Sequence, residues 1–588
     1  MHIIPTDLNL EIQSLWEKSK KGVGLHRFSP LKPMKYVYNK IERPAVPLPI
    51  RLSAVDPICL DILYNRGIKT PAEMEDFLFP SLTKQLRAHP PLLDMDKAVS
   101  ILKMVVANKE MVTIYHDYDV DGVTAGVTAL SALSQMGVPV NHYCNDRITG
   151  GFGINAAGVD EIMAKFPNTK VLLTVDNGIA GIEGVARAKE LGLKVIITDH
   201  HEPGTKLPDA DAVIDHKRAD ELAGQDKNCC GAGVVWKLML ELYIGLGRNV
   251  EPVMDLLDIV ALGTIADVVP LIGDNRAIVQ EGLKRINSGA RPFFQMCLEV
   301  LEKESIDAMT VAFRIAPMIN AVSRMGGDAS KLIELFMETN ADDLRAGIIA
   351  LDDINEARKE ETRRETELAK ELVGEEPVGA IVFNHESLQE GIVGIVAGQL
   401  KEEFSLPAVV LAKDKDGNWK GSARSPEGFM LKEALDQCAE YLISYGGHAK
   451  AAGLTVRAAD LEKFKEKLTK LALEAAGDKG FEVAIPIDAV LGARDYTEDM
   501  VRHLGILEPF GEGFRQPLFG LIADNITGVR YMGAEDQHVK YQDESGLQVI
   551  QWNKGDEAKA RKTPPKKFVG YPGLNVFRGN TTVQFIAE

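Results

Sequence analysis

The feature that most constrains this chain is a cluster of three aspartates within five residues, Asp117, Asp119 and Asp121. An apolar, β-favouring run, 111–115, precedes the cluster, and residues 124–136 carry Ala, Val and Leu at helical spacing. The cluster is therefore expected at a strand-to-helix turn, where open α/β sheets hold their ligands. Carboxylates this close repel one another unless a cation neutralises them, which predicts a metal site. A solvated, helix-capping loop is the alternative.

Length and composition are those of a globular protein. With 588 residues the chain is too long for one core and should form about three or four domains. Its net charge of −18 argues against a nucleic-acid-binding surface over the whole molecule. A positive cleft on an otherwise acidic protein remains compatible with that charge.

The cysteines and the N-terminus bear on the cellular location. The six cysteines show no CxxC spacing and no framework of disulfides, which predicts reduced thiols in a cytoplasmic protein. The N-terminus lacks the basic start and the continuous apolar run of a signal peptide. No stretch approaches the ~18 apolar residues that a membrane helix requires. We therefore expect a cytoplasmic protein without membrane contact.

Two further apolar runs, 170–175 and 194–198, are long enough for buried parallel strands, and the helical segment 181–191 lies between them. A strand, a helix and a strand with acidic residues at each strand end predict a doubly wound parallel sheet. Its active edge should lie on one side, at the carboxyl ends of the strands.

These strand ends supply further candidate ligands. Asp176 follows the first run, His200 and His201 follow the second, and Asp267 follows the helix-like segment 255–266. If the strands are neighbours, these side chains converge on the aspartate cluster. Carboxylates and imidazoles without a thiolate favour Mg²⁺ or Mn²⁺ over structural zinc. Taken alone, Asp176 is equally compatible with a turn, and the histidines with an internal hydrogen-bonded group.

The rest of the chain divides by composition. A proline-rich N-terminal extension is expected to wrap on the first domain. The charge-dense stretch 356–373 predicts an exposed connecting helix whose glutamates cancel the field of its arginines. The predicted boundaries are an extension at 1–84, a catalytic α/β domain at 85–280, a helical connector at 281–375, a second α/β domain at 376–476 and an all-β domain at 480–588.

The second α/β unit contains candidates for phosphate binding. Glycines let a backbone approach an anion, hydroxyls donate to phosphate oxygens, and arginine grips phosphate in a fork. The segment Ser422-Ala423-Arg424-Ser425 combines these groups, and Gly446-Gly447-His448 follows it. The glycine-rich run 391–398 is compatible either with a phosphate loop or with close helix packing.

The last hundred residues carry short alternating runs separated by turns, which predict an all-β module, most simply a small barrel. A basic stretch, 559–567, lies beside Phe568 and Tyr571 and suits single-strand binding. A solvated loop around Pro564 and Pro565 is the alternative.

Together these residues resemble the DHH phosphoesterase superfamily and, within it, the RecJ family. The resemblance runs in order from about residue 66 to the C-terminus. It implies a DHH core, a smaller α/β DHH-associated domain joined to it by a long helix, and a C-terminal OB-fold. The matching segments are 119–122, 147–154, 176–178, 199–201, 263–271, 446–448 and 507–513.

This resemblance also implies a function. RecJ proteins are single-stranded-DNA-specific exonucleases that act from the 5′ end with two Mn²⁺ or Mg²⁺ ions in recombination and repair. A single-strand-binding protein and a helicase are the partners that the family suggests. Two rival functions are a DHH phosphoesterase acting on short oligonucleotides or cyclic dinucleotides, and a non-catalytic scaffold that binds single strands.

Roles for individual residues follow from the same resemblance. The implied metal ligands are Asp119, Asp121, Asp176, His200 and Asp267, with Asp117 and His201 as catalytic or orienting groups. The expected substrate-binding residues are Arg147, Asn320, Arg324, Ser422, Arg424, Ser425, Gly447 and His448.

The chain departs from the family pattern in three places. Met318 and Ser323 replace a usual Arg and Gly in the segment 317–324, which predicts a changed affinity or substrate preference. Phe152 stands where Tyr is frequent, and residues 1–65 match no pattern that we recognise.

Overall fold

The computed structural model describes residues 35–38, 42–148, 150–221, 228–477, 480–481, 484–577 and 579–588. The first 34 residues, for which the sequence predicts no role, lie outside these ranges. No helix within them is long and apolar enough to cross a membrane. All six cysteines are free thiols.

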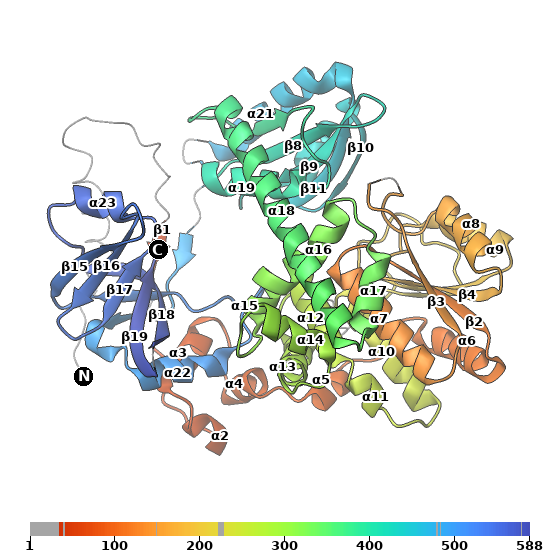
Figure 1. The fold of residues 1–588 in the computed structure, drawn as a ribbon, viewed down its shortest axis with the longest axis horizontal. Helices are drawn as coiled ribbons and strands as arrows, with labels where there is room; N and C mark the ends of the chain where they lie inside the picture. The colour runs from red at the N-terminus through yellow and green to blue at the C-terminus, as the bar shows by residue number, and fades with distance from the viewer. Residues whose placement is uncertain are drawn as a thin grey trace.

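A five-stranded parallel sheet forms the first domain, in the order β3-β2-β4-β5-β6. Helices α6, α7 and α10 pack on one face and α8 and α9 on the other, which confirms the doubly wound sheet (Figure 1). The bounds are α6 Met95–Asn108, β2 Met111–His116, α7 Val120–Gln135, β3 Val140–Cys144, α8 Ala156–Lys165, β4 Thr169–Val175, α9 Ile182–Glu190, β5 Lys194–Thr198, β6 Ala212–Ile214 and α10 Gly231–Gly245.

Helix α7 begins four residues earlier than its apolar spacing indicates. Asp119 is its N-cap, and the carboxylate of Asp119 accepts the N–H of Gly122 at 3.1 Å. An aspartate at this position satisfies a backbone donor that the helix itself leaves open. The acidic loop therefore runs directly into the first helical turn and places Asp121 there.

Helices after the sheet pack against the other side of α7 in a second apolar core. The last of them, α18, has 33 residues and passes from this region to the second lobe (Figure 1). It starts earlier than the predicted connecting helix. The bounds are α11 Glu251–Met254, α12 Leu257–Ala266, α13 Gly273–Asn287, α14 Pro292–Val300, α15 Ala308–Thr310, the π-helix η1 Val311–Ile315, α16 Ala316–Arg324, α17 Ser330–Met337 and α18 Ala341–Val373.

The second lobe is a five-stranded mixed sheet in the order β10-β11-β9-β8-β7. The glycine-rich run falls at the start of α19, where a Cβ on Gly394 would lie 3.2 Å from the Ser422 hydroxyl. The run therefore packs closely against Ser422 and Arg424 of β9, and a phosphate-binding role for its glycines stays a prediction. The bounds are β7 Ile381–Asn384, α19 Val393–Phe404, β8 Ala408–Lys413, β9 Trp419–Arg424, α20 Leu431–Asp436, β10 Leu442–Gly447, β11 Ala451–Val456 and α21 Leu461–Ala476.

The C-terminal domain is all-β as predicted, with a sheet in the order β13-β14-β18-β19-β17-β16-β15. Two details of this domain depend on pairing that the sequence pattern does not reveal. The run that forms β12 pairs with β1 instead of joining this sheet, and the long strand β18 starts within the basic stretch. The bounds are β1 Lys35–Val37, β12 Ala484–Pro486, β13 Ala489–Gly492, α22 Glu498–Leu504, β14 Phe519–Ile522, β15 Ile526–Met532, β16 His538–Asp543, β17 Gln548–Gln551, α23 Gly555–Ala560, β18 Lys567–Phe577 and β19 Asn580–Ala587.

Most cations at the start of the basic stretch are engaged by acids. Lys559 pairs with Asp536 and Asp556, and Arg561 pairs with Glu557. Such exposed pairs reduce the positive field that a nucleic acid would meet. The solvated-loop interpretation is therefore better supported than single-strand binding at these two residues.

Helices α2, α3 and α4 pack on the C-terminal domain, whereas the sequence predicted contact with the first domain; α5 does make that contact, through Leu82 and Leu86. Buried side chains of α3 and α4 join the apolar core under the C-terminal sheet. The bounds are α2 Ile50–Ser53, α3 Pro57–Asn65, α4 Pro71–Leu78 and α5 Leu82–Ala88.

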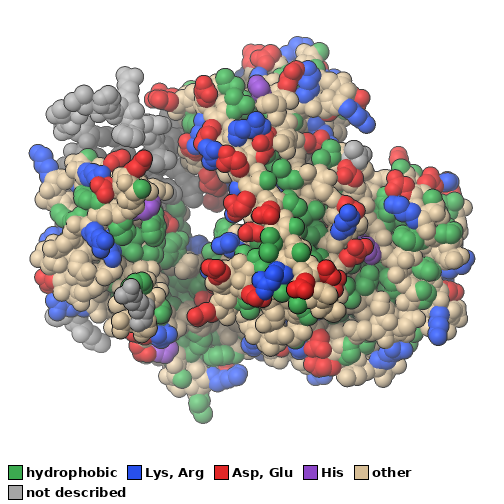
Figure 2. Space-filling model, in the orientation of Figure 1, with side chains coloured by type: hydrophobic (Ala, Val, Ile, Leu, Met, Phe, Trp, Pro, Cys, Tyr) green, Lys and Arg blue, Asp and Glu red, His purple; other side chains and the backbone are tan. Residues whose placement is uncertain are grey.

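Arg276 of α13 joins these parts to the first domain. It is 1% exposed, and its guanidinium donates to the carbonyls of Phe77, Leu507, Glu508 and Pro509 at 2.7 to 3.1 Å. The three lobes surround an opening that also shows in the space-filling view (Figure 2).

Candidate active site and its relatives

The acidic loop after β2 is buried and held by backbone groups of a distant helix. Asp117 and Asp121 are 4% and 2% exposed. The Asp121 carboxylate accepts the N–H groups of Gly231 at 2.6 Å and of Ala232 at 2.9 Å, at the N-terminus of α10. Burial, followed by repulsion from Asp119, raises the pKa of Asp121 to about 6. The helix N-terminus thus partly compensates a carboxylate that lacks a cation.

Asp176 stands at the end of β4, next to this loop. Its φ of +60° lies in the left-handed region, which Asp and Asn adopt more readily than most residues. Its side chain is buried, and burial together with neighbouring carboxylates, Asp121 foremost, raises its pKa.

His200 follows β5 and lies among the carboxylates. Its Nε2 is 3.1 Å from Asp176 Oδ1 and 3.7 Å from Asp121 Oδ2, and its Nδ1 is 3.7 Å from Asp267 Oδ2. Burial, and next the charge of His201, lowers the pKa of His200 to about 3. A neutral imidazole at this position keeps a lone pair available for a cation.

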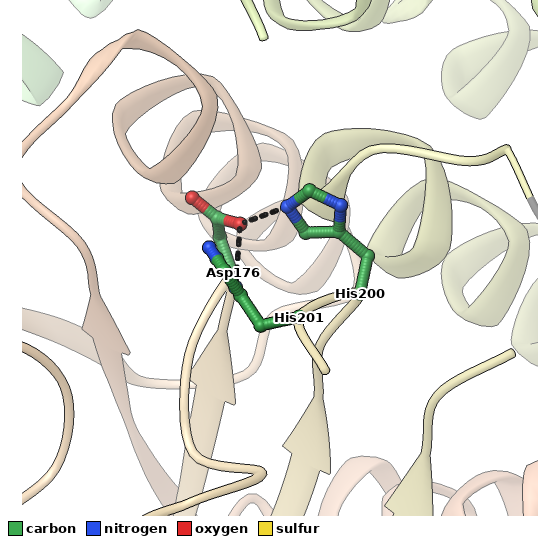
Figure 3. Close-up of side chains that lie close together, drawn as sticks. All are labelled: Asp176, His200 and His201. Atoms are coloured by element: carbon green, nitrogen blue, oxygen red, sulfur yellow. Dashed lines mark ion pairs between the residues drawn. The ribbon is translucent and has the colours of Figure 1, made fainter. Parts of the chain in front are cut away.

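His201 faces the same space but has a different partner. Its Nδ1 lies 2.7 Å from Asp199 Oδ1, and Asp199 also accepts the backbone N–H groups of Ile179, His200 and His201. Burial lowers the pKa of His201, but the hydrogen bond and charge of Asp199 outweigh it and raise the pKa to about 9. Figure 3 shows both histidine rings beside Asp176.

Three groups of possible metal ligands overlap in this pocket. Within each group the ligand atoms lie within 4.8 Å of one another. The groups are Asp117, Asp119 and Asp176; Asp121, His200 and Asp267; and Asp176, His200 and His201. All seven metal and catalytic residues that the sequence suggests therefore meet at one sheet edge.

The site also passes a test of fit for a divalent cation. Asp176 Oδ1 and His200 Nε2 are buried and lie 3.1 Å apart, but neither forms a hydrogen bond among the described residues. Buried polar atoms are normally paired, so these two atoms point to a missing ligand. Carboxylate oxygens with one imidazole are donors that suit Mg²⁺ and Mn²⁺.

Two glycines are required at this site, Gly231, which the sequence did not mark, and Gly263, which opens the matching segment 263–271. A Cβ on Gly231 would lie 2.4 Å from Asp176 Cβ, and one on Gly263 would lie 2.9 Å from Asp121 Oδ1. Both glycines therefore let a helix approach the carboxylates closely. Gly231 acts through its backbone, and such a residue leaves no side-chain signal in the sequence.

The predicted substrate residues of the first lobe border the pocket. The Arg147 guanidinium lies 4.7 Å from the centre of the Tyr118 ring, and Arg324 donates to the Gly391 carbonyl of the second lobe at 3.2 Å. Asn320 accepts the N–H of Val120 at 3.2 Å. Asn320 therefore holds the acidic loop directly.

Of the second-lobe residues, Ser422 and Arg424 lie together on β9, with 2.6 Å between Ser422 Oγ and Arg424 Nη1. His448 is exposed after β10, and Gly447 has a φ of +143° that favours glycine. Ser425 differs from these, because it is 5% exposed and donates to the Phe429 carbonyl at 2.7 Å. This geometry does not support the prediction that Ser425 contacts phosphate.

Met318 and Ser323, the two residues of α16 that depart from the family pattern, are both buried. Met318 is 2% exposed and belongs to the apolar core of the helical region. Ser323 is 1% exposed, and its hydroxyl lies 3.5 Å from Arg147 Nη1. Their effect on substrate preference stays a prediction.

Comparison with known proteins identifies the family. Three family models match: the DHH family, N-terminal domain, at residues 111–264, the DHHA1 domain at 377–474 and the RecJ OB domain at 487–588. The single-stranded-DNA-specific exonuclease RecJ of Salmonella typhimurium is 33% identical over 505 residues, covering 81% of this chain and 86% of that protein. The chain belongs to the RecJ family.

Other RecJ proteins agree with this assignment. The Bacillus subtilis protein is 34% identical over 514 residues, which cover 85% of this chain and 64% of the longer relative. The crystal structure of RecJ from Thermus thermophilus in complex with Mn²⁺ has a TM-score of 0.76 at 28% identity, covering 92% of this chain and 78% of that one. A complex of that RecJ with Mg²⁺ has a TM-score of 0.72. RecJ membership confirms the expected DHH core, DHH-associated domain and OB domain.

Proposed function

We propose that this chain is a metal-dependent exonuclease that degrades single-stranded DNA from its 5′ end. The observation that carries the proposal is the convergence of seven Asp and His side chains at one sheet edge, in three overlapping groups that share Asp176 and His200. The curated relatives are named single-stranded-DNA-specific exonucleases. We assign hydrolysis to residues 85–280 and strand binding to residues 376–476 and 480–588, with 281–375 as connector and 1–84 as an extension.

The residues that would hold the Mn²⁺ or Mg²⁺ ions are Asp119, Asp121, Asp176, His200 and Asp267. Bound there, the ions supply activation of water and neutralise the charge that grows on the scissile phosphate. The protein contributes a preset geometry: the N-terminus of α10 holds Asp121, and Asn320 fixes the backbone of the acidic loop. Asp117 would orient the cluster or complete it.

His201 is proposed to act on the phosphate itself. The hydrogen bond to Asp199 fixes its ring, and a pKa of about 9 keeps it protonated at neutral pH. A protonated imidazole at this position can donate to a phosphate oxygen or to the leaving oxygen. Asp199 is thus a positioning residue for His201.

Phosphates of the strand would be held from both lobes. Arg147 and Arg324 contribute from the first lobe, and Ser422, Arg424 and His448 from the second, with the backbone at Gly447. Cleavage then takes place between the lobes. A single-strand-binding protein and a helicase are the partners that we propose, in recombination and repair, and the free thiols agree with a cytoplasmic location.

The decisive experiment compares 5′-labelled and 3′-labelled single strands, duplex DNA, dinucleotides and cyclic dinucleotides in the presence of Mn²⁺. We expect release of mononucleotides from the 5′ end of single strands and little attack on duplex or dinucleotides. Preferred cleavage of dinucleotides would favour the short-substrate phosphoesterase. Binding of single strands without any hydrolysis would favour the scaffold.

A further inference from the structure

Four arginines from four elements approach one another where α18 passes between the lobes. Arg147 follows β3, Arg324 ends α16, Arg358 lies on α18 and Arg424 ends β9. Burial foremost, together with the charges of the other three arginines, lowers the pKa of Arg324 to about 10. None of the four forms an ion pair with a carboxylate within the described part of the chain. Like charges gathered in a partly buried region repel one another, and a bound anion would relieve that repulsion.

Arg358 differs from the other arginines of its helix. Arg363 pairs with Glu360 at 2.6 Å and with Glu367 at 2.8 Å, and Arg364 pairs with Glu361. The predicted cancellation by glutamates therefore holds for those two arginines. It does not hold for Arg358, whose neighbour Glu356 pairs with Lys359 instead.

The Arg358 side chain is turned toward the protein and is incompletely paired. Its Nη2 donates to the side chain of Asn355 at 2.5 Å, and Asn355 is 1% exposed. Its Nε is buried and has no hydrogen-bond partner among the described residues. Asn355 therefore orients a guanidinium that still has donors to offer.

We propose that Arg358 binds a phosphate of the single strand as the strand crosses between the lobes, together with Arg147, Arg324 and Arg424. This inference rests on the proposed function and adds the connecting helix to the binding surface. A guanidinium with free donors matches phosphate oxygens geometrically as well as in charge. The phosphate is either an internal phosphodiester or the 5′-terminal phosphomonoester.

Binding measurements with a matched pair of variants test this. Arg358→Met and Arg363→Met each remove one charge from the same helix and keep a similar apolar stem. Fluorescence anisotropy with oligothymidylate, in EDTA to prevent cleavage, gives the affinity at several salt concentrations. We expect Arg358→Met to weaken binding about tenfold, as for loss of a charged hydrogen bond. The slope of log affinity against log salt should fall by about 0.7, the value for one phosphate contact on a single strand. Arg363→Met should change neither quantity.

Oligonucleotides with a 5′-phosphate and with a 5′-hydroxyl identify which phosphate is held. A loss confined to the 5′-phosphorylated strand places Arg358 at the terminal phosphate, and an equal loss on both places it at an internal one. Arg358→Lys keeps the charge and should therefore retain the salt slope. It is the control for the possibility that Arg358→Met misfolds.

An Arg358→Met variant with the affinity and slope of Arg363→Met overturns the inference while leaving the proposed function intact. Failure of the wild-type protein to bind single strands overturns both.

Discussion

Replacing Asp176 by Asn should stabilise the metal-free protein and abolish its nuclease activity. Asn is nearly isosteric and accepts the left-handed backbone at this position, whereas Ala would add strain. The ligand oxygens of Asp117, Asp119 and Asp176 lie within 4.8 Å of one another. Two unit charges at that separation repel by about 3 kcal/mol at an effective dielectric constant of about 20.

The repulsion between the carboxylates determines how much the free energy of unfolding should rise when Asp176 is replaced by Asn. Asp176 has four carboxylate neighbours, Asp121, Asp119, Asp117 and Asp267, but it relieves part of the repulsion by taking up a proton, since burial and these carboxylates raise its pKa. We therefore expect the free energy of unfolding in EDTA to rise by the equivalent of one pair, about 3 kcal/mol. Thermal unfolding should show a midpoint several degrees higher.

Two further measurements complete this test. Mn²⁺ should raise the unfolding midpoint of the wild type but not of Asp176→Asn, because the variant lacks a ligand. Loss of a residue that supports a metal ligand reduces activity roughly 10- to 100-fold. Loss of the ligand Asp176 itself should reduce nuclease activity by more than that. Asp258→Asn is the matched control: this buried carboxylate pairs with Arg291 at 2.7 Å, so its loss should destabilise the protein. A lower midpoint for Asp176→Asn in EDTA, or a retained response to Mn²⁺, would refute the reasoning.

Three further predictions concern pH, substrate binding and domain contacts. The folded-state pKa of Asp121 is raised from 3.8 to about 6. The free energy of unfolding of the metal-free protein should therefore fall as pH rises through that range and remain low at higher pH. Stabilisation by Mn²⁺, measured by thermal unfolding, should accordingly be larger at about pH 8 than at about pH 6, where protons compete; equal shifts would contradict this. Arg424→Ala should weaken single-strand binding and reduce its salt slope by about 0.7, and an unchanged slope would count against a phosphate contact. Arg276→Met leaves buried carbonyls without a donor and should lower the free energy of unfolding by at least about 3 kcal/mol, which denaturant unfolding measures; an unchanged midpoint would show that the contact is dispensable.

Much of the first domain could be predicted because its signals are local. Uninterrupted apolar runs give buried parallel strands, and a carboxylate or imidazole directly after each run lies at the same edge of the sheet. The prediction failed where tertiary context decided. Strand β18 carries Lys567 at its start and Gly570, Pro572 and Gly573 within it, a composition that suggests a loop, and only pairing with β14 and β19 makes it a strand.

In the candidate site, too, some residues could be identified from the sequence and others only from the fold. Side chains that act as ligands were visible in the sequence, since their chemistry is in the residue type. Gly231 and Gly263 act through a missing Cβ, which matters only once two helices meet the carboxylates. The burial of the Ser425 hydroxyl and the unsatisfied Nε of Arg358 depend on how each side chain is oriented in the folded protein, which the residue type does not reveal.

The joint at Arg276 has a consequence for how these proteins diverge. All four acceptors of its guanidinium are main-chain oxygens, so a change of side chain at Phe77, Leu507 or Glu508 leaves every acceptor in place. The C-terminal module can therefore accumulate substitutions over evolution without detaching from the catalytic body. Gln280 and the backbone N–H of Leu271 also donate to main-chain carbonyls of this segment, those of Glu508 and Glu512, so the same tolerance extends beyond Arg276.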